Sequence, residues 1–165
     1  MEFDLAVTIR RPPAVVFALL LDVGDYGDRS PSSLVPVMEK SPSGPTRPGT
    51  LWHEVVRVGP GMRMTVWSEV LEVDPERVLR ERYWSSWMTG TLDYTLEPTT
   101  DGTRLRLRKT LVPKGPLRLL DRPIAAMLGP RELWRLEAIR DLLEAAPPVP
   151  GAAARPGSPS RQGAA

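Results

Sequence analysis

Residues 50–112 alternate apolar and polar side chains almost throughout, broken only by short turn sequences, and this pattern constrains the fold more than any other. A period of two indicates strands with one buried face. Turns are expected at Gly59-Pro60-Gly61 and Asp74-Pro75-Glu76, and Asp101-Gly102 is the strongest hairpin signal, since both central residues of such a turn favour positive φ. Short connections pair consecutive strands antiparallel, which predicts a meander. The predicted strands cover residues 50–58, 62–73, 77–84, 87–97 and 103–112.

The sequence before this meander predicts further regular elements. Residues 2–10 alternate like a half-buried strand, and Pro12-Pro13 suits the first turn of a short helix, where a missing N–H costs nothing. Residues 22–31 are rich in Gly, Asp and Ser, which indicates a loop, with or without a short helical turn. A further strand is predicted over residues 34–40.

The sequence after the meander changes to a helical period between Pro116 and Pro147. Gly129-Pro130 interrupts the apolar stripe, so two helical segments with a break or kink are expected. Residues 147–165 lack the apolar side chains needed to offset their ordering entropy and are predicted to be a disordered tail. The chain is therefore expected to be one α+β domain over residues 1–146. A curved antiparallel sheet of about seven strands would wrap a long C-terminal helix, with one or two short helices after the first strand.

Composition excludes several classes of site. The 165 residues include no cysteine and one histidine, and the formal net charge is +2. Disulfides and thiolate metal sites are therefore excluded, and we expect no metal and no cofactor. A chain so close to neutral gives no electrostatic argument for nucleic acid. The longest apolar run, residues 14–21, is too short to span a bilayer, and the N-terminus lacks a basic signal-peptide region, so a cytoplasmic location without membrane insertion is expected. No oligomeric state is predicted.

Several short stretches, in this order and spacing, resemble the START-like helix-grip superfamily (SRPBCC), which includes polyketide cyclase/dehydrase and lipid-transport proteins. The stretches are Arg11-Pro12-Pro13-Ala14-Val15-Val16-Phe17, Pro48-Gly49-Thr50, Glu72-Val73-Asp74-Pro75-Glu76-Arg77-Val78-Leu79, Leu96-Glu97-Pro98 and Asp101-Gly102-Thr103-Arg104-Leu105. The resemblance implies an internal cavity between the sheet and the final helix. It leaves function open, because this superfamily mixes carriers, receptors and enzymes.

Three functions are consistent with that cavity and with the residues. The first is binding of a small hydrophobic ligand, lipid-like or polyketide-like. The second is a polyketide cyclase or aromatase using the same cavity, so whether the chain is an enzyme stays undecided. The third is a structural or regulatory partner that uses the tail as a tether, and this hypothesis predicts a core without a cavity.

Lys109 is the unusual member of a face that is otherwise apolar, since Leu105, Leu107 and Leu111 share it. A buried ammonium needs a partner, because an unpaired one costs several kcal/mol. Glu81 is the preferred partner if Leu79, Glu81 and Tyr83 point inward; otherwise a lysine at a strand end extends its ammonium to water. If the strand at residues 77–84 has the opposite phase, Arg82 points inward instead.

The remaining candidates are aromatic, sulfur-containing or titratable. His53 would be a general base if its strand neighbours Leu51 and Val55 point inward, and a tyrosine hydroxyl would bind a ligand carbonyl or donate a proton. Flat indole rings and flexible methionines make adaptable cavity walls, although they are equally common in plain cores. The candidate catalytic residues are His53, Tyr94 and Arg82. The candidate ligand-binding residues are Trp52, Met64, Trp67, Glu81, Tyr83, Tyr94, Leu107, Lys109, Met127 and Trp134.

Overall fold

The computed structural model describes residues 1–21, 37–59 and 61–145. The predicted loop at 22–31, the first residues of the predicted strand at 34–40 and the predicted tail at 147–165 lie outside the described residues.

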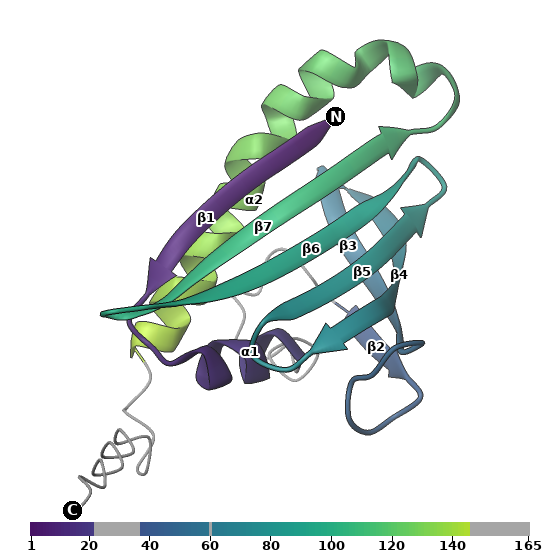
Figure 1. Ribbon diagram of the computed structural model, residues 1–165. Coiled ribbons are helices and arrows are strands. Elements are labelled where there is room, and N and C mark those ends of the chain that lie inside the picture. Colours follow the sequence, from purple (N-terminus) through teal and green to yellow (C-terminus); the bar gives the residue numbers. More distant parts are fainter. Residues whose placement is uncertain (22–36, 60, 146–165) are drawn as a thin grey trace, which may run out of the picture.

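A seven-stranded antiparallel sheet forms most of the molecule, in the order β1-β7-β6-β5-β4-β3-β2 (Figure 1). The strands are β1 (Glu2–Ile9), β2 (Val37–Ser41), β3 (Leu51–Gly59), β4 (Met62–Asp74), β5 (Val78–Ser85), β6 (Met88–Thr99) and β7 (Gly102–Pro113). The first strand therefore joins the last, and the strands between follow the chain as a meander. Seven strands and their antiparallel order confirm the sequence prediction.

Two helical elements follow the sheet. The 3-10 helix η2 (Gly115–Leu120) leads into α2 (Asp121–Ala145), and α2 packs against β1 on one side of the curved sheet (Figure 1). The short helix α1 (Pro13–Leu21) begins at the predicted proline and packs against β6 and β7. Within the described ranges, no helix is long and apolar enough to cross a membrane.

The helix α2 continues through Gly129-Pro130 without ending, so a break at this position, one of the two predicted alternatives, is wrong. Proline removes one backbone donor but does not prevent helical φ, and packing against the sheet keeps the chain helical on both sides. At the far end, Arg11 caps the helix. Its Nε donates to Leu143 O at 2.9 Å and its Nη2 to Glu144 O at 3.4 Å, which satisfies carbonyls that have no partner within the helix.

The hairpin between β6 and β7 is present, but its register differs from the prediction by one residue. Thr99 pairs with Gly102, so Thr100 and Asp101 form the two-residue loop. Gly102 has φ 148°, and a Cβ there would lie 2.2 Å from Ile9 O. Glycine is required because the end of β1 passes so close, and this distance depends on tertiary structure.

The side of the sheet that faces α2 carries the core. Register places Leu5 beside Leu107 and Leu96 beside Leu105. Leu96, Leu105 and Leu107 are buried, and Leu5 is half-buried. Leu136 and Leu143 of α2 are also buried. The opposite side carries ion pairs between neighbouring strands, joining Arg80 to Glu72 and Asp93, Arg82 to Glu69, and Arg106 to Asp4. This inside–outside contrast is what the alternation predicts.

Candidate functional site

A set of seven charged and tyrosine side chains lies on the inner side of the sheet and on the facing side of α2. Alternate residues of a strand share a face, so the pairing of strands assigns the five strand residues to the inner side. The two residues of α2 are placed there by the burial of Glu132, by its ion pair with Lys109 and by the electrostatic interactions of Arg135 with Tyr94 and Glu81. The seven residues are Glu54 of β3, Glu81 and Tyr83 of β5, Tyr94 of β6, Lys109 of β7, and Glu132 and Arg135 of α2. We call this set the interior polar cluster.

Lys109 points inward as predicted, but its partner is Glu132 and not Glu81. Lys109 Nζ lies 2.6 Å from Glu132 Oε1, and each side chain is only 11% exposed. The ammonium also lies over the Tyr83 ring, 5.2 Å from its centroid. Burial lowers the pKa of Lys109, while the Glu132 carboxylate opposes that fall. The prediction failed because the partner lies on α2, whose rotation about its own axis is set by packing.

Glu132 itself is only half satisfied. Its Oε2 is buried and, among the described residues, has no hydrogen-bond partner. An unpaired buried carboxylate oxygen is costly, so this position is held by the pairing of Oε1 with Lys109 and by the packing of α2.

Tyr83 reaches across a neighbouring strand. Its hydroxyl donates to Thr110 O on β7 at 2.8 Å, passing over Gly90 of β6. A Cβ at Gly90 would lie 2.0 Å from Thr110 O and 2.7 Å from the Tyr83 oxygen. Glycine at position 90 therefore makes this hydrogen bond possible. The bond engages the hydroxyl of Tyr83, which was predicted to bind a ligand.

Glu81 is a half-buried carboxyl group with a shifted titration. Burial raises its pKa to about 7, the nearby Glu54 carboxylate adds to the rise, and the Arg135 guanidinium opposes it. At neutral pH the group is therefore poised between carboxyl and carboxylate, which is the range in which general acid–base groups operate.

Tyr94 is buried beside Leu107, which is fully buried as well. Burial raises its pKa to about 12, with Arg135 opposing the rise and Glu81 adding to it, so the phenol keeps its proton. In the part of the chain that the structure describes, no hydrogen bond joins the side chains of Glu54, Glu81, Tyr94 and Arg135 to one another.

Two candidate catalytic residues lie on the outer side of the sheet, and this corrects their expected placement. His53 stacks on Trp67, with ring centroids 4.3 Å apart, and its Nδ1 lies 3.4 Å from Glu39 Oε2. Arg82 is exposed and bonds Glu69 at 2.7 Å. The phase of β5 therefore turns Leu79 and Tyr83 inward, because their burial outweighs that of Arg80 and Arg82. Trp67, expected in the cavity wall, is 41% exposed on the same outer side.

The other predicted wall residues divide between the core and the surface. Trp52 and Met64 are buried, and their register places them on the inner side. Trp134, by contrast, is 42% exposed on α2, because the helix turns Leu136 and not Trp134 toward the sheet. The side chain of Met127 lies outside the described part of the chain. The structure thus brings together Glu81, Tyr83, Tyr94, Leu107 and Lys109, with Trp52 and Met64 on the same face.

Sequence reasoning missed three members of the interior polar cluster. Glu132 precedes Leu136 by four residues, and Arg135 follows Glu132 by three, so both belong to the buried side of α2 at helical spacing. Glu54 follows Trp52 by two residues on β3, so the two side chains share a face of the sheet. Those spacings were the available signal, but charged residues at such positions are far more common on exposed faces.

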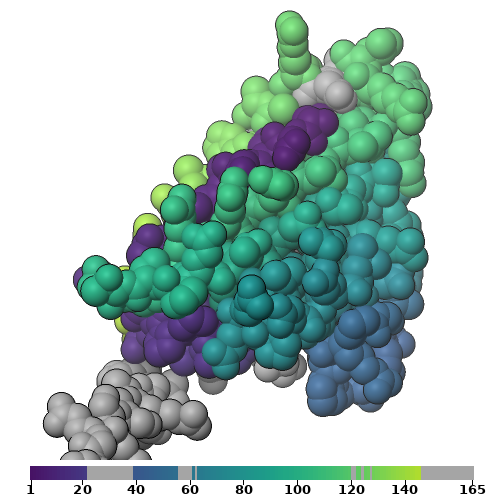
Figure 2. All heavy atoms as spheres, viewed as in Figure 1, coloured from purple at the N-terminus to yellow at the C-terminus, as the bar shows by residue number. Residues whose placement is uncertain are grey.

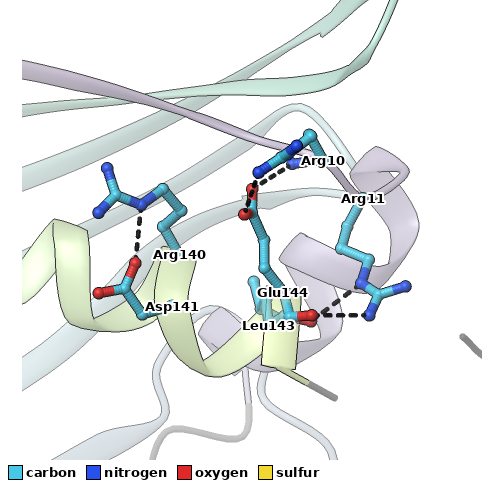
Figure 3. Close-up of polar contacts among 6 residues, drawn as sticks. All are labelled: Arg10, Arg11, Arg140, Asp141, Leu143 and Glu144. Atoms are coloured by element: carbon cyan, nitrogen blue, oxygen red, sulfur yellow. Dashed lines mark hydrogen bonds and ion pairs between the residues drawn. The ribbon is translucent and has the colours of Figure 1, made fainter. Parts of the chain in front are cut away.

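An open cleft of about 820 Å³ lies elsewhere, where the end of α2 meets β1 and the β6–β7 turn. Four of its five charged lining residues pair with each other: Arg10 with Glu144 at 3.2 Å and Arg140 with Asp141 at 2.8 Å (Figure 3). A backbone hydrogen bond from Arg10 and its guanidinium lower the pKa of Glu144. Because this cleft is polar, exposed and internally paired, the interior polar cluster is the better candidate site.

Comparisons with known proteins agree with the architecture. Residues 1–144 match the family described as polyketide cyclase / dehydrase and lipid transport. No curated protein matches the chain by sequence. Among solved structures, the chain is similar to the Zhui aromatase/cyclase from Streptomyces sp. R1128, with 20% identity and a TM-score of 0.73 over 87% of this chain and 93% of that one. It is similar to Ara h 8.0201, with 17% identity and a TM-score of 0.70 over 88% of this chain and 99% of that one. It is also similar to TTHA0849 from Thermus thermophilus, with 22% identity and a TM-score of 0.69 over 88% of this chain and 98% of that one. At these identities the structural likeness concerns the fold alone.

Proposed function

The chain belongs to the polyketide cyclase/dehydrase and lipid transport family, and we propose that it holds a small, largely apolar molecule between the sheet and α2. The molecule's polar group would lie against Tyr94, Glu81 and Arg135, and Trp52, Met64 and Leu107 would contact its apolar body. Such a division, with mostly apolar walls and a few convergent polar groups, is typical of small-molecule sites.

One observation carries this proposal: four members of the interior polar cluster, Glu54, Glu81, Tyr94 and Arg135, interact electrostatically in the interior, yet their side chains are not hydrogen-bonded to each other. Burial is the largest cause of the pKa shifts of both Glu81 and Tyr94. Among the described residues, however, Glu132 Oε2 is the buried side-chain atom without a partner. The unbonded oxygens of Glu81 and Tyr94 therefore keep some accessible surface, which supports an internal space beside them.

The chemistry of these groups favours a ligand with a carbonyl or hydroxyl oxygen. The Tyr94 phenol keeps its proton and is a donor, and the Glu81 carboxyl both donates and accepts near neutral pH. Arg135 provides a fixed positive charge beside them. A neutral oxygen group on a flat or flexible apolar body satisfies all three without adding charge to an enclosed site.

Native mass spectrometry of the protein purified from its own host tests this proposal, followed by thermal-shift titration with a panel of lipids and polyphenols. We expect a retained or stabilising apolar ligand. Tyr94→Phe and Glu81→Gln should each weaken its binding about tenfold, as loss of one hydrogen bond implies. His53→Ala on the outer side is the matched control and should bind normally. No ligand and no thermal shift across the panel would contradict the proposal.

A second candidate function, an enzyme of the cyclase or aromatase type, is favoured by the poised carboxyl of Glu81. As a carboxylate, Glu81 would remove a proton from carbon beside a ketone, and Tyr94 would hydrogen-bond the oxygen on which negative charge develops. Folding a flexible chain into a reactive geometry contributes further. Turnover of candidate polyketides should rise with pH through about 7. Glu81→Gln should abolish it while His53→Ala and Arg82→Gln do not. Equal activity of Glu81→Gln and the wild type would exclude this mechanism.

A further inference from the structure

One end of the molecule combines exposed apolar side chains with a local excess of positive charge. Leu119 of η2 is 88% exposed and Trp87 of the β5–β6 turn is 40% exposed. Lys114, Arg118 and Arg122 lie on the same stretch as Leu119, and all three are exposed. We call these five residues the tip surface.

Two segments distant in sequence build the tip surface together. The backbone N–H of Lys114 donates to Trp87 O at 2.7 Å, and Lys114 Nζ donates to Ser85 O at 2.7 Å. Arg118 Nε donates to Pro113 O at 3.2 Å, so η2 is held against the end of β7. The ribbon places η2, the end of β7 and the β5–β6 turn at one end of the molecule (Figure 1). These bonds hold Lys114 against the Trp87 turn and hold η2, with Arg118, at the same end of the molecule.

The exposed side chain of Leu119 does not contribute to the packing of the fold. The Leu119 side chain is 88% exposed and so gains almost nothing from burial, and the basic residue Arg118 directly precedes it. In residues 113–131 the basic residues are Lys114, Arg118, Arg122 and Arg131, and the only acid is Asp121. The rest of the chain is close to neutral, since the formal total is +2. Positive charge is thus concentrated in the stretch that carries Leu119, the most exposed large apolar side chain among the described residues.

From this combination we propose that the tip surface docks on an anionic lipid surface, with Leu119 and Trp87 entering the interface and the three basic residues contacting the headgroups. Apolar and indole side chains favour the headgroup boundary, and each nearby Lys or Arg adds attraction to anionic lipid. The charge excess and the two protruding apolar groups act in the same direction. The space-filling view shows the residues of η2 and the start of α2 at the upper edge of the molecule (Figure 2). The docking is peripheral, because the apolar groups come from a short 3-10 helix and a turn.

Vesicle flotation of the full chain tests the proposal, with phosphatidylcholine vesicles compared to phosphatidylcholine–phosphatidylserine vesicles. We expect binding to the anionic vesicles that weakens with added salt, and little binding to phosphatidylcholine alone. Arg118→Gln/Arg122→Gln should weaken binding on the order of 30-fold, at about 1 kcal/mol per basic residue. Trp87→Ser/Leu119→Ser should weaken it at least about tenfold.

The controls carry equivalent changes at the other end of the sheet. Leu71→Ser removes an apolar side chain that is 41% exposed, and Arg104→Gln removes an exposed charge; both should bind like the wild type. Circular dichroism verifies that every variant is folded. Absence of wild-type binding to anionic vesicles, or equal losses in the controls, would overturn the proposal. So would a dimer in analytical ultracentrifugation that Trp87→Ser/Leu119→Ser disperses, because the tip surface would then contact a second copy.

Discussion

Lys109 Nζ lies 2.6 Å from Glu132 Oε1, and this ion pair joins the inner side of β7 to α2 in an environment where each side chain is only 11% exposed. The pair joins the helix to the sheet within the interior polar cluster. Removing one partner leaves the other as an uncompensated buried charge. Replacing both partners with uncharged side chains of similar shape, in contrast, costs little stability.

The first prediction concerns this pair. Lys109→Met should lower the free energy of unfolding by about 3 kcal/mol or more, since Glu132 is left unpaired. The double variant Lys109→Met/Glu132→Leu should recover most of that loss. Urea denaturation of the single and double variants measures both. A double variant that is less stable than Lys109→Met would contradict the argument and show that Glu132 has a second stabilising role.

The second prediction concerns Gly90. Gly90→Ala should destabilise the protein by about 2 kcal/mol or more, because the new Cβ would lie 2.0 Å from Thr110 O and strands β6 and β7 must separate. Tyr83→Phe should cost about 1 kcal/mol, the worth of its hydrogen bond. Thr95→Ala on the same strand, facing the other side, is the control and should change stability by less than about 1 kcal/mol. Chemical denaturation of the three variants is the measurement.

The third prediction concerns pH. The folded-state pKa of Glu81 is raised to about 7 from 4.5, so the folded protein binds more protons than the unfolded chain between these values. Stability should therefore fall as pH rises from 4.5 to 7, by up to about 3 kcal/mol, and level off above that range. Glu81→Gln should remove this dependence and be more stable than the wild type at pH 8.

Unfolding free energies of both proteins at pH 5 and pH 8 test that prediction. Glu72→Gln, on the outer side of the sheet, is the control and should keep the wild-type slope. An unchanged slope in Glu81→Gln would show that another group titrates in this range.

The fourth prediction concerns the end of α2. Arg11→Met should lower stability by about 1 kcal/mol, because it removes donors to the Leu143 and Glu144 carbonyls and a positive charge at a helix C-terminus. Arg10→Met removes an ion pair whose arginine side chain is 77% exposed, so a change of less than about 0.5 kcal/mol is expected. Thermal denaturation of both variants distinguishes the cap from the surface pair, and equal effects would contradict the distinction.

The strands were predictable because their signal is local. Alternation along residues 62–73 or 103–112 is a property of a few neighbouring side chains. Strand β4 differs from its predicted range by one residue at its C-terminal end, and β7 by one residue at each end. Lys109 could be identified as an inward cation for the same reason. The hairpin signal at Asp101-Gly102 was correct in kind but not in register, because Gly102 is required by the approach of Ile9, which is distant in sequence.

The sequence by itself determined the α+β class, the antiparallel meander and the inner placement of Tyr94 and Lys109, since period and turn chemistry act over a few residues. Only the tertiary structure decided that Lys109 pairs with Glu132, that Arg135 faces Glu81 and Tyr94, and that His53 and Arg82 lie outside. The physical reason is that these relationships depend on the rotation of α2 and on the phase of each strand. Both are fixed by burial of many side chains together, and a single residue type does not carry that information.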